Sequence, residues 1–298
     1  MSRPLDPSKI GAGLGCFANH PFWDAVARVH ALGFQSIELL SVEGSRHSVG
    51  LLPGIWFDGI SVEDFDRLRA ALASFAHTSV HAPFVDAPLF TYNRRIAQEA
   101  LRQVEACIAV AGRLGMRTVA VHANPRGQLD ARDYWDDMVR VFRELGDAAA
   151  EAGTQVGLET GYPNRYQQFL DLVRDIDHPA VGACVDIGHV AFLQESGPRG
   201  TDEGVATYNR NLEALCRELG PRLVHMHLHD VRKDDWRDHR QLGTGVIDLP
   251  ALARTLTEID YGGLMQFELE EPNQEPALLA SRAALETAVD ALARTAPR

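Results

Sequence analysis

Short apolar stretches alternate along the chain with longer segments in which apolar residues recur every three or four positions. The short stretches are typical of buried β-strands, and the longer segments are typical of amphipathic helices. Strands are predicted over residues 10–17, 36–42, 78–84, 118–125, 155–161, 180–189, 222–230 and 263–270. The helices that follow them are predicted over residues 22–33, 61–75, 93–115, 131–153, 166–176, 208–220, 249–259 and 276–294. The pattern thus predicts eight consecutive strand–helix pairs.

Residues that favour helix ends support several of these bounds. Ser61, followed by Glu63 and Asp64, is typical of a helix start. Glycine, which readily adopts the left-handed conformation that ends many helices, closes four of the predicted helices. These glycines are Gly33, Gly115, Gly153 and Gly220.

Alternating strands and helices indicate a parallel sheet with right-handed crossovers. Eight such units in 298 residues predict an α/β fold, a single (β/α)8 barrel whose active site lies at the C-terminal ends of the strands. An open doubly wound sheet is the alternative. The glycines of "GAGLGC" (11–16) lie within the first strand and lack the spacing of a dinucleotide-binding turn. Because no linker interrupts the pattern, residues 1–298 are expected to form one domain.

Composition narrows the classes of function. The chain has 41 acidic against 29 basic residues, a formal net charge of −12, which disfavours a surface for nucleic acid or anionic membrane. The four cysteines lie far apart without a CxxC pair, as expected for reduced thiols. No apolar signal segment or membrane-length apolar run is present, so a cytoplasmic protein is expected.

Polar side chains gather where the predicted strands end. His81 and His122 are 41 positions apart, as are Asp186 and His227, and His227 and Glu268. This interval is about one strand–helix unit, so these side chains should lie at similar heights on their strands. Each could alone be a hydrogen-bonded or ion-paired residue, but carboxylates and imidazoles that converge favour a divalent-cation site. The full set at the strand ends is His81, His122, Glu159, Asp186, His189, His227 and Glu268.

The stretch "HMHLHD" (225–230) places His225, His227 and His229 on one face of the seventh strand. Each two-residue step along a strand advances about 6.6 Å. The three imidazoles therefore cannot all reach one ion at the barrel mouth, and one or at most two can be ligands.

These motifs resemble the sugar isomerase/epimerase-like barrels, a superfamily that groups xylose isomerase-like enzymes with ketose 3-epimerases, inosose dehydratases and the endonuclease IV family. The resemblance covers essentially the whole chain. It rests on "LET" (158–160), "VDIGH" (185–189), "HLHD" (227–230) with "DHRQLGTGVID" (238–248), and "YGGLMQFELE" (261–270).

By position, the resemblance implies one divalent metal held by Glu159, Asp186, His227 and Glu268. His227 is chosen because the family's ligand lies three residues before an acidic residue, here Asp230. Glu268 is preferred to Glu270 because the family's glutamate lies seven residues after the tyrosine of "YGG". His189 resembles a contact to a substrate oxygen. Such an oxygen-rich site suits Mn²⁺ first, and also Mg²⁺ or Co²⁺, better than a structural zinc.

The expected chemistry is proton transfer on a small sugar or polyol through a metal-stabilised enediolate, with Glu159 and Glu268 as general bases. Two bases on opposite faces of the substrate give epimerisation, and one base gives aldose–ketose isomerisation. Loss of a β-hydroxyl from the same enediolate would instead give an inosose-type dehydration. The sequence leaves these outcomes, the substrate, the metal count and a homo-oligomeric state open.

Two departures from the resemblance matter. Ketose 3-epimerases have a second glutamate where this chain has Arg165, so Arg165 and Arg240 are candidates to bind an anionic substrate group. The alternative is that these arginines are solvated. His81 and His122, expected at the barrel mouth as substrate contacts, are also ligand positions in the endonuclease IV family. A di- or trinuclear zinc phosphodiesterase is therefore the alternative function, although "DHR" (238–240) breaks that family's Asp-x-His pattern.

Overall fold

The computed structural model describes residues 5–295, and eight parallel strands close into a barrel at its centre. Their order around the barrel is β1-β10-β9-β8-β7-β6-β5-β2. The bounds are β1 (Ile10–Gly13), β2 (Ser36–Leu40), β5 (His77–His81), β6 (Thr118–Val121), β7 (Gln155–Glu159), β8 (Val181–Asp186), β9 (Leu223–Leu228) and β10 (Leu264–Phe267). The predicted single (β/α)8 barrel is confirmed.

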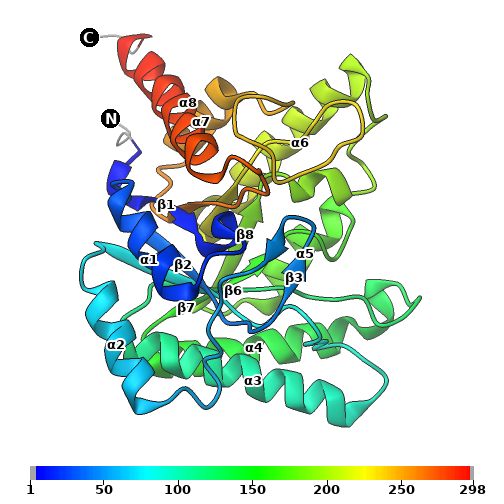
Figure 1. The fold of residues 1–298 in the computed structure, drawn as a ribbon. Helices are drawn as coiled ribbons and strands as arrows, with labels where there is room; N and C mark the ends of the chain where they lie inside the picture. The colour runs from blue at the N-terminus through cyan, green and yellow to red at the C-terminus, as the bar shows by residue number, and fades with distance from the viewer. Residues whose placement is uncertain (1–4, 296–298) are drawn as a thin grey trace.

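Eight long helices surround this barrel in the described part of the chain (Figure 1). They are α1 (Phe22–Ala31), α2 (Val62–Leu72), α3 (Arg94–Arg113), α4 (Trp135–Ala152), α5 (Tyr166–Ile176), α6 (Asp202–Leu219), α7 (Leu249–Glu258) and α8 (Gln274–Thr295). The first and last helices lie side by side, joined by an ion pair between Arg28 of α1 and Glu275 of α8. They close the ring of helices next to β1, which pairs with both β2 and β10.

The register of the strands shows which residues of neighbouring strands lie opposite the predicted site residues. Glu159 on β7 is opposite Cys184 on β8, and Asp186 on β8 is opposite His227 on β9. His227 is in turn opposite Gln266 on β10. Because all eight strands are parallel, their C-terminal ends meet at one mouth of the barrel.

The helix ends predicted from the sequence have the expected caps. The Ser61 hydroxyl accepts a hydrogen bond from the Asp64 backbone N–H at 3.0 Å, and α2 begins at the next residue. At the end of α4, Gly153 has a φ of 74°, a left-handed conformation that would strain a residue with a Cβ atom.

Several observed elements are shorter or longer than predicted, and two of these differences have a clear local cause or replacement. Helix α6 begins at Asp202, earlier than the predicted start at residue 208, because the Thr201 hydroxyl caps it by accepting from the Gly204 N–H at 2.9 Å. Gly204 interrupts the apolar pattern in the first turn of this helix. Glycine is needed there because a Cβ atom would lie 2.0 Å from the Pro198 carbonyl oxygen. The first predicted strand ends at Gly13, and Leu14–Phe17 form a 3₁₀ turn instead.

A short hairpin that the sequence pattern did not predict lies between β2 and α2. Its strands are β3 (Arg46–His47) and β4 (Gly50–Leu51). The Asn19 amide fixes it, donating to the Val49 carbonyl at 3.1 Å and accepting from the Leu51 N–H at 3.0 Å. Two-residue strands are too short to show an alternating pattern, which explains why the sequence did not reveal them.

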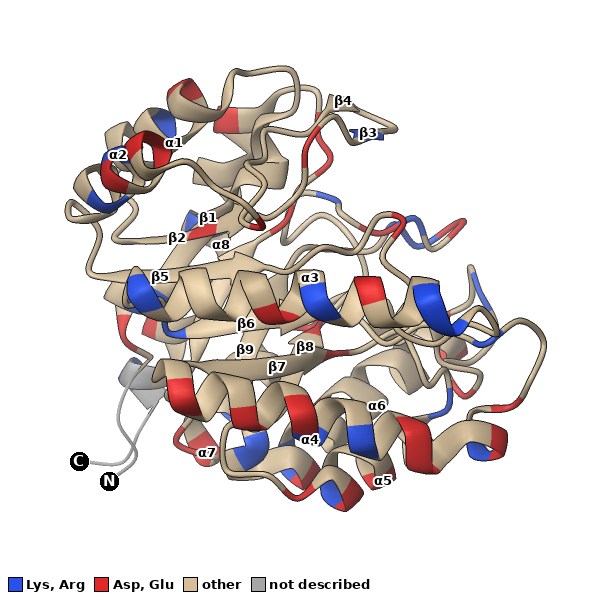
Figure 2. Ribbon diagram, turned by 90° about the horizontal axis from the view of Figure 1, so that it is seen from below, with Lys and Arg blue, Asp and Glu red and all other residues tan. Residues whose placement is uncertain are grey.

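Charged side chains cover the outer faces of the helices. Figure 2 shows acidic and basic residues interspersed along α3 and α4 rather than gathered by sign. Between residues 5 and 295, no helix is both long enough and apolar enough to span a membrane.

Candidate active site

The four side chains expected to bind a metal meet at the C-terminal mouth of the barrel. One ligand atom from each of them lies within 4.8 Å of those of the other three, the set being Glu159, Asp186, His227 and Glu268. Glu159, Asp186 and His227 are essentially inaccessible to solvent, whereas the Glu268 side chain is 17% exposed. The first three therefore form the floor of the site, and Glu268 lies toward its opening.

The two oxygens of Asp186 have different surroundings. Oδ1 accepts hydrogen bonds from the backbone N–H groups of Gly188 (2.8 Å) and His189 (2.9 Å), and His229 Nε2 lies 2.7 Å away. Oδ2 is buried and has no hydrogen-bond partner among the described residues. A buried carboxylate oxygen without a donor is costly. Because Oδ2 belongs to the four-residue group, a bound cation would satisfy it.

His227 presents one ring nitrogen to the site and the other to the barrel interior. Nδ1 lies 3.2 Å from Glu159 Oε1 and 3.5 Å from Glu268 Oε2. Nε2 lies 2.8 Å from Oε1 of Glu38, a buried residue of β2. Burial alone would lower the pKa of His227, but the surrounding carboxylates hold it well above its usual value.

The two carboxylates expected to move protons have opposite pKa shifts. Burial would raise the pKa of Glu159, but His122 and His227 hold it well below the usual value. Burial, helped by the negative charges of Glu159 and Glu38, raises the pKa of Glu268 to about 7. Without a bound cation, the site therefore holds one ionised carboxylate and one that exchanges a proton near neutral pH.

A second group of possible ligands shares Glu159. Its Oε2 lies 3.1 Å from His81 Nε2 and 2.8 Å from His122 Nε2, and one ligand atom of each lies within 4.8 Å of the others. His81 Nδ1 is 2.9 Å from the Ala82 carbonyl oxygen, to which it donates. Its Nε2 therefore faces the carboxylate either as the N–H of an imidazolium or as a metal ligand. Against the effect of burial, Glu159 raises the pKa of His81 to about 9.

His229 supports Asp186 rather than joining the four-residue group. Its Nδ1 accepts a hydrogen bond from the His239 backbone N–H at 2.9 Å, so the ring hydrogen is on Nε2, facing Asp186 Oδ1. His189 is arranged in the opposite sense. Its Nδ1 donates to the Thr160 carbonyl at 3.0 Å, which leaves Nε2 as the nitrogen with an available lone pair.

Asp230 organises the loop that follows β9. Its Oδ1 accepts from the N–H groups of Val231 (2.8 Å) and Ile247 (3.1 Å), and its Oδ2 accepts from those of Gly243 (2.8 Å) and Gly245 (2.9 Å). A Cβ at position 245 would lie 2.2 Å from the Val231 carbonyl oxygen. The aspartate and glycines of "HLHD" and "LGTG" therefore form one structural unit.

We expect Asp230→Asn to lower the free energy of unfolding by about 2 kcal/mol. An amide has only one accepting oxygen, so its NH₂ group would face two of the four backbone N–H groups that now donate to Asp230. Urea unfolding would measure the change. Asp235→Asn, which alters an exposed residue paired with Arg232, is the control and should leave stability close to that of wild type. Equal stabilities for the two variants would contradict the structural role of Asp230.

A cavity of about 240 Å³ opens above the four-residue group. It is lined by Gly15, Leu40, His47, Leu52, His81, Phe84, His122, Glu159, His189, His239, Glu268, Leu269 and Glu270. Glu268 and Glu270 have separate roles there. Glu270 accepts from the Ser48 hydroxyl at 2.6 Å and lies 3.6 Å from His47 Nδ1, so it holds the β3–β4 hairpin at the rim.

The two arginines considered as anion contacts do not line this cavity. Arg240 is mostly buried and lies 3.3 Å from Glu271 and 3.9 Å from Glu270. Arg165 is exposed and precedes α5 directly. A substrate contact by either arginine stays a prediction, and for Arg240 it would require release of its carboxylate partners.

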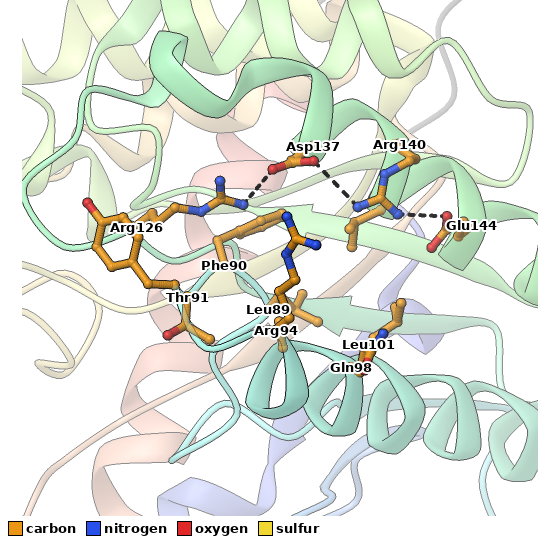
Figure 3. A pocket seen from close by; sticks show the side chains of 13 residues that line it. Leu89, Phe90, Thr91, Arg94, Gln98, Leu101, Arg126, Asp137, Arg140 and Glu144 are labelled. Carbon is orange, nitrogen blue, oxygen red and sulfur yellow. Dashed lines mark hydrogen bonds and ion pairs between the residues drawn. The ribbon is translucent and has the colours of Figure 1, made fainter.

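A larger cavity, of about 630 Å³, lies outside the barrel between α3 and α4. Figure 3 shows ion pairs among Arg126, Asp137, Arg140 and Glu144, and none drawn to Arg94. Arg126 lies 2.7 Å from Asp137, and Arg140 lies 3.5 Å from Asp137 and 2.8 Å from Glu144. With these ionised groups neutralised inside the cavity, the barrel mouth is the better candidate for catalysis.

Two residues near the site were not predicted from the sequence. Glu38 contacts His227 from inside the barrel, and His239 lines the cavity while its N–H orients His229. The sequence feature that could have indicated Glu38 is that it is the one charged residue in the mostly apolar strand "SIELL". His239 lies in a loop, where no periodic pattern indicates which way a side chain points.

Comparison with known proteins supports the resemblance seen in the sequence. The model of the xylose isomerase-like TIM barrel family matches residues 26–294. An uncharacterized protein of Methanocaldococcus jannaschii is 27% identical over 199 residues, which are 63% of this chain and 63% of that protein. The match therefore spans slightly less than two thirds of that relative. The inosose isomerase of Bacillus licheniformis is 26% identical over 217 residues, 68% of this chain and 70% of that enzyme.

Solved structures share the fold along nearly the whole chain. A D-tagatose 3-epimerase-like protein has a TM-score of 0.73 at 19% identity, covering 96% of this chain and 98% of that one. IolI with a bound zinc atom has a TM-score of 0.68 at 18% identity, covering 97% and 99%. A xylose isomerase-like TIM barrel protein of Mycobacterium smegmatis in complex with magnesium has a TM-score of 0.67 at 18% identity, covering 94% and 100%. At these identities the likeness is one of fold.

Proposed function

The chain belongs to the xylose isomerase-like TIM barrel family, and from this premise we propose that it is a divalent-metal-dependent isomerase or epimerase of a sugar or sugar derivative. The observation that carries the proposal is the convergence of three carboxylates and one imidazole at the barrel mouth. Relatives and structural neighbours named as inosose isomerase and tagatose 3-epimerase-like support a sugar substrate.

The donor set fits one divalent cation. Glu159, Asp186, His227 and Glu268 would hold it, and the unpartnered Asp186 Oδ2 is a ready ligand. Three carboxylates and one imidazole suit Mn²⁺, Mg²⁺ or Co²⁺, of which we propose Mn²⁺. When bound, such a cation supplies Lewis acidity, which makes the C–H beside a substrate carbonyl more acidic.

The two carboxylates with opposite pKa shifts would move the proton. Glu159 extends from β7 and Glu268 from β10, with β8 and β9 between them in the barrel. With the cation bound both carboxylates are ionised, so we propose that each can take a proton from the substrate carbon and return it. Action from two faces of the substrate carbon gives epimerisation, and action from one face gives isomerisation.

The cavity favours a compact polar ligand. Its volume of about 240 Å³ lies below the range of about 300–1,000 Å³ that is common for larger ligands. His81, His122 and His189 supply polar groups to its lining, and Leu40, Leu52 and Phe84 supply apolar ones. We propose that the three histidines bind hydroxyl or carbonyl oxygens of the substrate.

Solvent deuterium exchange tests this function. The Mn²⁺-loaded protein would be incubated in D₂O with a panel of ketoses, inososes and sugar acids, and the substrates analysed by NMR. We expect deuterium at the carbon beside the carbonyl of at least one compound, and product analysis would separate epimerisation, isomerisation and dehydration. No exchange into any compound would contradict proton-abstraction chemistry.

Metal uptake is expected to release protons at pH 7. In the metal-free protein, His227 has a pKa well above its usual value and Glu268 has a pKa of about 7, so the first is protonated and the second about half protonated. A cation competes with these protons, so its apparent affinity should rise with pH until both groups are deprotonated. Calorimetric titration with Mn²⁺ in buffers of different ionisation enthalpy would show the release; enthalpies independent of the buffer would contradict it.

The group of His81, His122 and Glu159 supports a second candidate function. Because Glu159 belongs to both groups, it could bridge two adjacent cations. Paired cations are typical of phosphodiester hydrolysis, so the alternative is a multinuclear zinc phosphodiesterase. The two functions differ in the metal-to-protein ratio.

A further inference from the structure

Glu38 on β2 lies in the barrel interior, directly beside His227. Its side chain is completely buried, and its neighbours in sequence are the apolar Ile37 and Leu39. A buried carboxylate is costly unless hydrogen bonds or opposite charges compensate it. The groups that do so are the imidazoles of His225 and His227 and the hydroxyl of Ser79.

The two oxygens of Glu38 have different partners. Oε2 accepts a hydrogen bond from the Ser79 hydroxyl at 2.8 Å and lies 2.7 Å from His225 Nε2. Oε1 accepts no aligned hydrogen bond from any described residue, and it lies 2.8 Å from His227 Nε2. Ser79 thus hydrogen-bonds one oxygen, which also lies beside His225, and the other oxygen faces His227.

The orientation of His227 gives this contact its importance. A neutral imidazole binds a cation through one nitrogen and carries its hydrogen on the other. Here Nδ1 faces Glu159 and Glu268, and Nε2 faces Glu38. If Nδ1 is the ligand, Nε2 carries the hydrogen, and Glu38 Oε1 lies 2.8 Å from that nitrogen as a potential acceptor.

We propose that Glu38 is a positioning residue of the metal site, which holds the Nε2 hydrogen of His227 and so keeps Nδ1 available to the cation. This inference rests on the proposed metal-dependent function. Carboxylates that accept from a metal-binding imidazole fix its tautomer and orientation, and their loss typically costs about 10- to 100-fold in metal affinity. His225, from the same strand as His227, lies beside the other oxygen of Glu38.

The first test compares Mn²⁺ affinity, measured by calorimetry, in wild type, Glu38→Gln and the surface variant Glu258→Gln. Glutamine keeps the shape of Glu38 but removes its charge, so we expect about 10- to 100-fold weaker binding. Glu258→Gln makes the same side-chain change on the surface, where Glu258 pairs with Arg217, so its affinity should stay close to that of wild type. A folded Glu38→Gln protein with wild-type affinity would overturn the inference.

The second test needs no variant and therefore does not depend on whether Glu38→Gln folds. In ¹⁵N-histidine-labelled wild type loaded with Zn²⁺, NMR should show a hydrogen on Nε2 of His227 that exchanges slowly with solvent. A hydrogen on Nδ1 instead, or an unprotonated Nε2, would overturn the assignment. If wild type bound neither Mn²⁺ nor Zn²⁺, the proposed function would fail, whereas binding without an effect at Glu38 would refute only this inference.

Discussion

Glu159→Gln is expected to slow deuterium exchange into the substrate by at least about 100-fold, the lower end of what general acid–base catalysis contributes. Glu159 is the carboxylate held ionised at neutral pH, and it contacts imidazoles on three other strands or strand ends. An amide cannot remove a proton, and it also weakens the ligand set. Because glutamine keeps the side-chain volume, the variant should remain folded.

Glu258→Gln is the control for this experiment. Glu258 ends α7 on the surface, where it pairs with Arg217, so its neutralisation should leave the exchange rate close to that of wild type. Circular dichroism of both variants would verify the fold. A Glu159→Gln protein with wild-type exchange would remove Glu159 from the mechanism.

The largest effect on metal binding is expected from Asp186→Asn. The amide oxygen of asparagine should take the position of Oδ1. Two backbone N–H groups donate to that position, and an NH₂ group cannot accept hydrogen bonds from them. The NH₂ group would then occupy the position of Oδ2, presenting hydrogens where the cation needs a lone pair. We expect Mn²⁺ affinity to fall by more than about 100-fold, beyond the typical loss of a supporting residue.

Asp248→Asn is a matched control for this variant. The Asp248 side chain caps α7 by accepting from the Ala251 N–H at 3.0 Å, a role in which asparagine is equally good. Its Mn²⁺ affinity should equal that of wild type in the same calorimetric titration. If Asp186→Asn also bound Mn²⁺ like wild type, Asp186 would not be a ligand.

The sequence was informative about residues at the ends of strands. Repeating strand–helix units return the chain to the same barrel mouth, so the equal spacing brings Asp186, His227 and Glu268 to that mouth, although His227 is opposite Gln266 rather than Glu268. Their convergence in space follows from the closed sheet. The same reasoning explains why the three histidines of "HMHLHD" separate into one candidate ligand and two supporting residues.

Contacts that depend on the barrel interior or on loops could not be read from spacing. Glu38 meets His227 across the barrel, and a single acidic residue in an apolar strand does not identify its partner. Arg240 lies in the loop organised by Asp230, where its pairing with Glu271 depends on the folded path of the chain. The sequence therefore identified candidate ligands better than the residues that orient them.

The metal-to-protein ratio tests the proposed active site most directly. Wild type and Asp186→Asn would be exposed to Mn²⁺, Co²⁺ or Zn²⁺, freed of excess ions, and measured by elemental analysis. We predict one Mn²⁺ or Co²⁺ per wild-type chain and essentially none in Asp186→Asn. Two or three zinc ions per chain would instead support the phosphodiesterase, and a wild-type protein that takes up none of these metals would contradict both functions.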